Sequence, residues 1–177
     1  MLDFVLLVLM ITMPIFWLRI IKKKSWGKIK QELIPIKKNP FVELVGGVKL
    51  FFALLIGFLL LSMVFNLSGI NDLEKVSEVI AINSQNITLY LIVIIIMVFV
   101  EELFFRSFLV KQIGLIPSSI IFGIAHIGYY SIAQVIGAFA LGLMLAYWFK
   151  QNNSITQNYL GHLLYNLFAI ILYILSG

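Results

Sequence analysis

The fold is decided by residues 87–110, which read ITLYLIVIIIMVFVEELFFRSFLV. As an α-helix rising about 1.5 Å per residue, this run is long enough to cross the roughly 30 Å hydrocarbon core of a membrane. The rest of the chain has the same character, because 62% of its 177 residues are hydrophobic, 12% are charged and its mean hydropathy is +1.05. A soluble domain carries about twice that share of charged residues. We therefore expect an all-α polytopic membrane protein.

Other apolar runs, separated by polar or turn-forming residues, extend this prediction to about six transmembrane helices. Ser154, with Gln157 three residues later, has the pattern of a capping box that opens the last helix. We divide the chain into residues 1–86, a two-helix membrane region with a basic segment and a short external loop, and residues 87–177, a four-helix catalytic core. The spans expected before the last helix are residues 2–18, 44–65, 87–110, 117–128 and 132–149.

The charges indicate how the chain lies in the membrane. Eight of the thirteen basic residues fall between Arg19 and Lys38, directly after the first apolar run. Basic residues beside spans mark the cytoplasmic side, so this segment predicts a multi-pass protein of the cell membrane with both ends outside. The net charge of +5 is thus a topology signal and not a nucleic-acid-binding face. A second interpretation of the segment is a patch that binds anionic lipid or an acidic substrate.

The absence of cysteine narrows the possible chemistry. With no cysteine in the chain, disulfides, thiolate metal sites and cysteine nucleophiles are excluded.

Glu101 and Glu102 lie inside an apolar span, where a charged side chain costs roughly 2.5 to 3.5 kcal/mol and therefore indicates function. Glu102 and Arg106 are four residues apart and can form a structural ion pair, so the role of Glu102 stays open. Glu101 points about 100° away and has no such partner.

The two histidines also lie in apolar helices. His126 lies in the fourth predicted span, and His162 shares a helix face with Asn166 four residues later. Counted from the cytoplasmic ends of their helices, Glu101, His126 and His162 lie about 11 to 15 Å deep. We therefore expect these rare polar groups to meet in one layer of the membrane.

The residue types in this layer indicate a site that activates a water molecule. A desolvated carboxylate is a competent general base, which suits Glu101, and His126 can orient the same water or protonate the leaving amine. His162 and Asn166 can donate hydrogen bonds to the oxyanion formed from a peptide carbonyl. A Ser-His-Asp triad lacks its third member, because Glu101 and Glu102 are the only acids within the predicted spans. A zinc ion held by the two histidines and a glutamate remains open, although no HExxH spacing supports it.

Three motifs resemble those of the CAAX protease and bacteriocin-processing (CPBP) intramembrane endopeptidases. They are Glu-Glu-x-x-x-Arg at 101–106, Phe-x-x-x-His at 122–126 and His-x-x-x-Asn at 162–166, and the resemblance covers residues 87–171. It implies an all-helical membrane bundle that cleaves membrane-associated proteins. By resemblance, Glu101 and His126 activate water, His162 and Asn166 form the oxyanion pocket, Glu102 and Arg106 support them, and no metal or other cofactor is needed.

The resemblance also implies the partners. Besides membrane lipids, we expect a peptide or lipidated protein substrate, either a prenylated CAAX protein or a bacteriocin or signal peptide, that reaches the site from the cytoplasmic side. One alternative is an immunity or scaffold protein of the same fold that binds a peptide without cleaving it. Another is a small proton-coupled transporter that uses the buried carboxylates as a relay.

Overall fold

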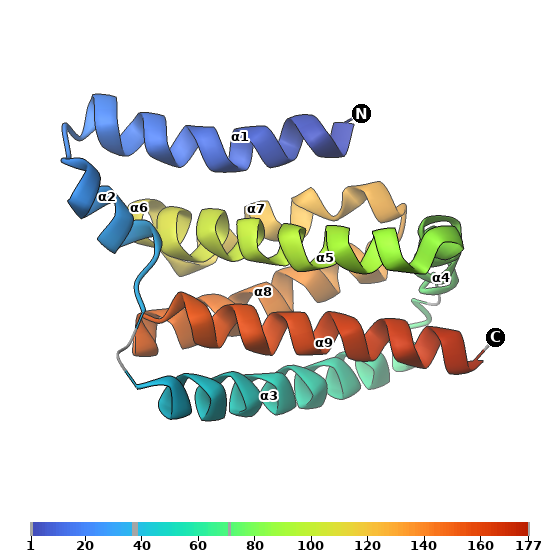
Figure 1. Cartoon of the computed structure of the whole chain (residues 1–177). Coiled ribbons are helices and arrows are strands. Elements are labelled where there is room, and N and C mark those ends of the chain that lie inside the picture. The colour runs from blue at the N-terminus through green and yellow to red at the C-terminus, as the bar shows by residue number, and fades with distance from the viewer. Residues whose placement is uncertain (1, 37–38, 71, 177) are drawn as a thin grey trace.

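The computed structural model describes residues 2–36, 39–70 and 72–176, and these residues form helices and no strand. The prediction of an all-α fold is confirmed. Figure 1 shows the long helices side by side with short segments at both ends of the bundle. In chain order the elements are α1 (Leu2–Phe16), η1 (Trp17–Ile21), α2 (Trp26–Leu33), α3 (Pro40–Leu67), α4 (Glu74–Asn83), η2 (Ser84–Asn86), α5 (Ile87–Glu101), η3 (Glu102–Val110), α6 (Lys111–Ile113), α7 (Leu115–Ala125), η4 (Ile127–Tyr129), α8 (Ile132–Asn152) and α9 (Ile155–Ser176).

Four of the described helices are long and apolar enough to cross a membrane, and they make this a multi-pass membrane protein. They cover Pro40–Leu67, Ile87–Ile113, Ile132–Asn152 and Ile155–Leu175. The other two predicted spans correspond to shorter apolar helices, Val5–Ile21 and Leu115–Tyr129. Four spans are thus supported by length and composition, and the count of about six stays a prediction.

The helix ends follow from local side-chain bonds. Asn39 Oδ1 accepts a hydrogen bond of 3.0 Å from the Phe41 amide at the start of α3, where Pro40 occupies the first turn. Ser154 Oγ accepts one of 3.2 Å from the Gln157 amide, which confirms the predicted start of α9. Glu43 of α3 is buried and accepts a hydrogen bond from the Ser154 hydroxyl. This contact joins the starts of α3 and α9.

Small residues let the helices approach closely. A Cβ atom built on Gly161 of α9 would lie 2.7 Å from Leu50 Cγ of α3. A Cβ atom on Gly142 of α8 would lie 2.7 Å from Phe122 Cδ1 of α7. Gly142 belongs to the stripe of small residues Ala138, Gly142 and Ala146, all buried, which agrees with the close packing that this spacing indicates.

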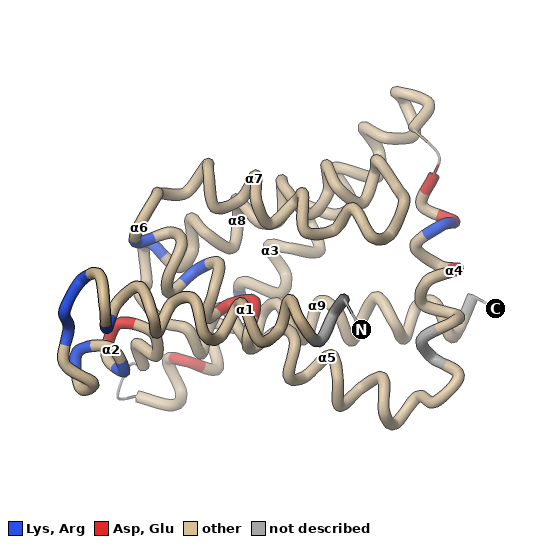
Figure 2. The backbone as a smooth tube through the Cα atoms, turned by 90° about the horizontal axis from the view of Figure 1, so that it is seen from above, with Lys and Arg blue, Asp and Glu red and all other residues tan. Residues whose placement is uncertain are grey.

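The basic end of the bundle is tied together by α2. Lys111 Nζ donates a hydrogen bond of 2.7 Å to the backbone oxygen of Glu32, and Trp17 Nε1 donates one of 3.2 Å to Gln112 Oε1. Figure 2 shows most of the lysine and arginine at this end and an acidic group around α4 at the other. Lys37 and Lys38, the last two residues of the predicted basic segment, lie outside the described residues.

Candidate active site

Glu101 and Glu102 lie at a change of helix type. The helix that begins at Ile87 is α-helical up to Glu101 and π-helical over Glu102–Val110. Wide π-helical turns are rare and often accompany functional sites.

The imidazole of His162 lies between the two carboxylates. Its Nδ1 donates a hydrogen bond of 2.8 Å to Glu102 Oε1, and its Nε2 lies 4.0 Å from Glu101 Oε2. Glu102 is fully buried and His162 is 6% exposed. Because Nδ1 is committed to Glu102, Nε2 is the nitrogen that remains to face a bound molecule.

Arg106, one turn after Glu102 in η3, is the fourth member of the cluster. Its Nε lies 3.5 Å from Glu102 Oε2, so the ion pair expected from the sequence is present. Its guanidinium carbon lies 4.3 Å from the ring centroid of Phe122, a cation–π distance. Glu102 therefore contacts both Arg106 and His162. One of its carboxylate oxygens faces the Arg106 guanidinium, and the other accepts the hydrogen bond that orients the His162 ring.

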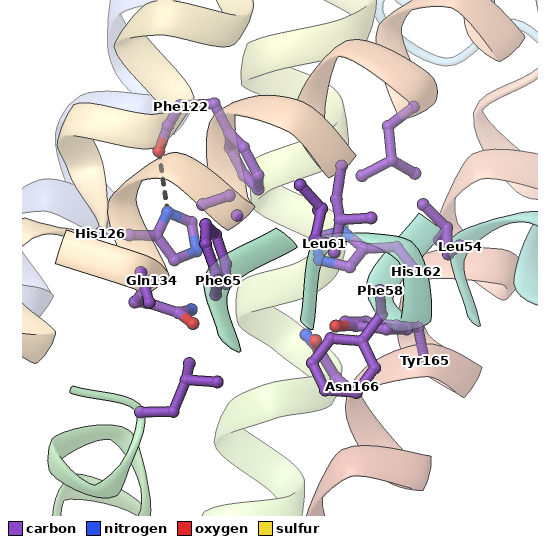
Figure 3. A pocket seen from close by; sticks show the side chains of 16 residues that line it. Leu54, Phe58, Leu61, Phe65, Phe122, His126, Gln134, His162, Tyr165 and Asn166 are labelled. Atoms are coloured by element: carbon purple, nitrogen blue, oxygen red, sulfur yellow. Dashed lines mark hydrogen bonds between the residues drawn. The ribbon is translucent and has the colours of Figure 1, made fainter. Parts of the chain in front are cut away.

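His126 reaches the same region from the end of α7. Its Nδ1 donates a hydrogen bond of 2.8 Å to the backbone oxygen of Phe122, which leaves Nε2 available (Figure 3). Its ring centroid lies 4.6 Å from that of Phe122 and 6.0 Å from that of Tyr129. The Phe122 ring thus packs against Arg106 on one side and His126 on another.

A pocket is lined by three of the six predicted site residues. It contains about 610 Å³ of empty space, its open mouth included, and its walls are mainly apolar side chains of α3 and α8. His126, His162 and Asn166 line it, together with the polar side chains of Gln134 and Tyr165 (Figure 3). Glu101 is not among the lining residues and reaches the site through its contact with His162.

Neither a direct Glu101–His126 contact nor a metal-binding cluster is seen among the described residues. Glu101 and His126 form no ion pair within 4.0 Å, so a water molecule shared by both would have to bridge a longer gap. No group of three histidine, aspartate or glutamate side chains in residues 2–36, 39–70 and 72–176 is arranged to hold a metal ion. The zinc alternative therefore gains no support from the geometry.

Sequence reasoning missed several residues around the site. Asn158 is buried one turn before His162 and donates a hydrogen bond of 2.8 Å to the backbone oxygen of Leu145. Its position could have been found, because residues 158, 162 and 166 share one helix face at four-residue spacing. Gln134 carried no such signal, whereas Tyr165 lies directly before Asn166 and could have been noticed beside that predicted site residue.

Apolar helices thus bring two carboxylates, two histidines and an amide together beside one pocket. Residues 83–168 match the family described as type II CAAX prenyl endopeptidase Rce1-like, so this segment of the chain is similar to that family. The match confirms the resemblance to CPBP proteases and spans all six predicted site residues. No curated protein and no solved structure matches the chain.

Proposed function

We propose that this protein is an intramembrane endopeptidase that hydrolyses a peptide bond with water activated by Glu101. The observation that supports this is the position of His162, whose two ring nitrogens face Glu101 and Glu102 while its ring lines a pocket shared with His126 and Asn166. Acid–base groups and hydrogen-bond donors converging on one pocket are what acyl transfer to water requires.

In the proposed reaction, the Glu101 carboxylate takes a proton from water as the water oxygen attacks the peptide carbonyl. Negative charge develops on the carbonyl oxygen, where His162 Nε2–H and the Asn166 amide donate hydrogen bonds. The carbon–nitrogen bond then breaks, and the departing amine receives a proton through Glu101 or His126. Glu102 accepts the Nδ1–H bond of His162 and so stabilises its protonated ring during these steps.

The substrate we propose is a membrane-associated or lipid-anchored peptide. The pocket walls carry Phe58, Phe65 and Leu61, which suit an apolar segment, and membrane spans surround the site. A prenylated CAAX protein and a bacteriocin or signal peptide both have this character, and the family match favours the first in its description.

The test is turnover by the purified protein in detergent. Cleavage of a quenched fluorescent peptide should be lost in Glu101→Gln and in His126→Ala, whereas Glu78→Gln, an exposed carboxylate of α4, should behave as wild type. Full turnover in Glu101→Gln would rule out the glutamate mechanism. Activity that resists a chelator, in protein with no bound metal by elemental analysis, would distinguish this mechanism from a zinc one.

The position of Glu101 outside the pocket lining favours one other function, that of a protein that binds a peptide without cleaving it. Such a protein would protect cells from a bacteriocin equally well as wild type and as Glu101→Gln. Loss of protection in Glu101→Gln would instead support the protease.

A further inference from the structure

The passage from α1 to α2 gathers exposed positive charge at one end of the bundle (Figure 2). Residues 17–33, which we call the basic elbow, contain six lysine or arginine residues and one acidic residue, Glu32. Glu32 is paired with Lys24. No other carboxylate among the described residues pairs with the remaining five cations, all of which are exposed: Arg19, Lys22, Lys23, Lys28 and Lys30. The basic elbow is therefore a surface with an excess of positive charge.

Two tryptophan rings lie beside these cations. The guanidinium carbon of Arg19 lies 5.4 Å from the ring centroid of Trp26, and Lys22 Nζ lies 6.0 Å from that of Trp17. Both distances are within the range of a cation–π contact. Trp26 is 61% exposed, so its ring covers Arg19 without being buried itself. Tryptophan is enriched at the level of the lipid headgroups, where its ring meets apolar and polar surroundings at once.

Hydrogen bonds hold the turn of the basic elbow in one shape. Arg19 Nη1 donates a bond of 3.0 Å to the backbone oxygen of Lys24, and the Lys24 amide donates one of 3.0 Å to the backbone oxygen of Leu18. Lys23 has a φ of 52°, a left-handed conformation that persists only where the surrounding structure enforces it. Lys22 and Lys23 thus project from a closed turn, which lowers the entropy that a ligand must overcome to bind them.

The apolar residues beside the charges indicate which class of anion fits. Phe16, Ile20 and Ile21 lie in the last two turns before Lys22, and each is at least half exposed. A soluble anion would leave these apolar side chains in water. A phospholipid, in contrast, brings acyl chains and a negatively charged phosphate to the same place, and a phosphate accepts charge-assisted hydrogen bonds from lysine and arginine.

The basic elbow is also packed against the segment that carries Glu102 and Arg106. Ile29 and Leu33, the buried residues of α2, belong to one apolar cluster with Phe105 and other residues of η3. Directly after η3, the Lys111 ammonium donates a hydrogen bond of 2.7 Å to a backbone oxygen of α2. A ligand that fixes α2 therefore also restrains η3.

We propose that the basic elbow binds the phosphate groups of anionic phospholipids and that this binding stabilises the packing of α2 against η3. The inference goes beyond the proposed function, because the lipid is a ligand of the α1–α2 turn and takes no part in the cleavage of a peptide bond. Binding follows from the unpaired cations and the exposed apolar residues beside them. The effect on η3 follows from the cluster and the hydrogen bond that join it to α2.

The first experiment measures lipid binding. The purified protein in detergent is titrated with phosphatidylglycerol or phosphatidylcholine, and the bound lipid is counted by native mass spectrometry. Phosphatidylglycerol should bind more tightly, and the variant Lys22→Gln/Lys23→Gln should bind it about tenfold more weakly or less. Lys75→Gln, which removes an exposed cation of α4, should bind as wild type. Arginine at positions 22 and 23 should retain the binding, which separates a loss of charge from a loss of folding.

The same titration distinguishes the sources of the phosphate. Glycerol phosphate, which has the headgroup without acyl chains, should not displace the bound lipid at the same concentration. Equal displacement by glycerol phosphate, or tighter binding of polyglutamate than of phosphatidylglycerol, would show that the ligand is a soluble anion and would overturn the lipid assignment. Equal binding of both lipids by wild type would overturn it as well.

The second experiment measures the effect on η3. In nanodiscs that contain phosphatidylglycerol, wild type should have a higher Tm and slower amide hydrogen exchange in residues 102–110 than in nanodiscs of phosphatidylcholine alone. Lys22→Gln/Lys23→Gln should show neither difference, and Lys75→Gln should show both. Lipid binding without any change in the exchange of residues 102–110 would overturn the link to η3. Neither experiment uses peptide cleavage, so a protein that cleaves no peptide would contradict the proposed function alone.

Discussion

His162 Nδ1 lies 2.8 Å from Glu102 Oε1, while the other ring nitrogen lies 4.0 Å from Glu101 Oε2. A carboxylate bound to one nitrogen of an imidazole fixes the ring's orientation and favours its protonated form. Two adjacent glutamates are thereby given separate tasks by one histidine. Glu102 holds the ring, and Glu101 faces the nitrogen that can meet a substrate.

The first prediction concerns Glu102→Gln. The amide can still accept a hydrogen bond from His162, but it lacks the negative charge that stabilises a protonated ring. Because one oxyanion donor is then weakened, we expect kcat to fall about 10²- to 10³-fold with KM nearly unchanged. Steady-state kinetics on the fluorescent peptide would show this. A rise in KM at constant kcat would indicate that Glu102 serves binding alone.

The second prediction concerns the buried ion pair. Arg106→Leu leaves the fully buried Glu102 without its cationic partner, and such a loss typically costs about 3–5 kcal/mol. Thermal unfolding followed by tryptophan fluorescence in detergent should show a clear fall in Tm. The double variant Glu102→Gln/Arg106→Leu should recover part of that loss, since no unpaired charge remains. A double variant less stable than Arg106→Leu would contradict this explanation.

The third prediction tests the packing behind the site. Gly142→Ala would place a Cβ atom 2.7 Å from Phe122 Cδ1 and push the ring against Arg106 and His126. Overpacking of this kind costs about 1–3 kcal/mol, and we expect turnover to fall as well because the ring supports His126. Gly128→Ala is the matched control, since nothing lies within 4 Å of a Cβ atom there. Equal behaviour of the two variants would show that Phe122 adapts freely.

The fourth prediction concerns Asp72, which binds the start of α8. Desolvation raises the pKa of its carboxyl. Hydrogen bonds from the Ile132 and Ala133 amides and the Ser131 hydroxyl, together with the charge of Lys75, lower the pKa by more. The pKa of Asp72 therefore lies below its ordinary value. A lowered pKa in the folded protein means that the stabilisation is complete above about pH 4 and is lost as the pH falls through the lowered value.

The measurement is the Tm of wild type and of Asp72→Asn between pH 7 and pH 3. The difference between the two proteins should be constant above about pH 5 and should shrink below about pH 4, where wild type loses its carboxylate. A difference that stays constant down to pH 3 would show that the charge of Asp72 contributes nothing to the contact with α8.

Much of the fold follows from single-chain patterns. The apolar run at 87–110 predicted a span, and the structure extends it to Ile113. The capping pattern of Ser154 and Gln157 predicted the start of α9. The intramembrane Glu101 and the face shared by His162 and Asn166 pointed to the site, because buried charge and helical spacing are properties of the sequence itself.

The contacts between helices could not be predicted in this way. The spacing of Glu102 and Arg106 indicated a pair on one helix, but it gave no means to see that His162 of another helix binds the same carboxylate. Depth counting placed His126 level with Glu101, but depth does not give lateral separation, and the two do not form an ion pair in the described structure. The buried Glu43 was missed because its partner, Ser154, is 111 residues away.

The π-helical segment Glu102–Val110 joins two fixed points of one helix. At its C-terminal end Lys111 donates a hydrogen bond to the backbone oxygen of Glu32, and at its N-terminal end Glu102 accepts one from His162. Each hydrogen-bonded ring of a π-helix contains one more residue than that of an α-helix, so the number of residues between the two anchors sets the rotation of the carboxylates relative to α9. Deleting a single residue between Arg106 and Lys111 is expected to rotate Glu101 and Glu102 relative to His162, so we expect the length of this segment to matter to the site as much as its side chains.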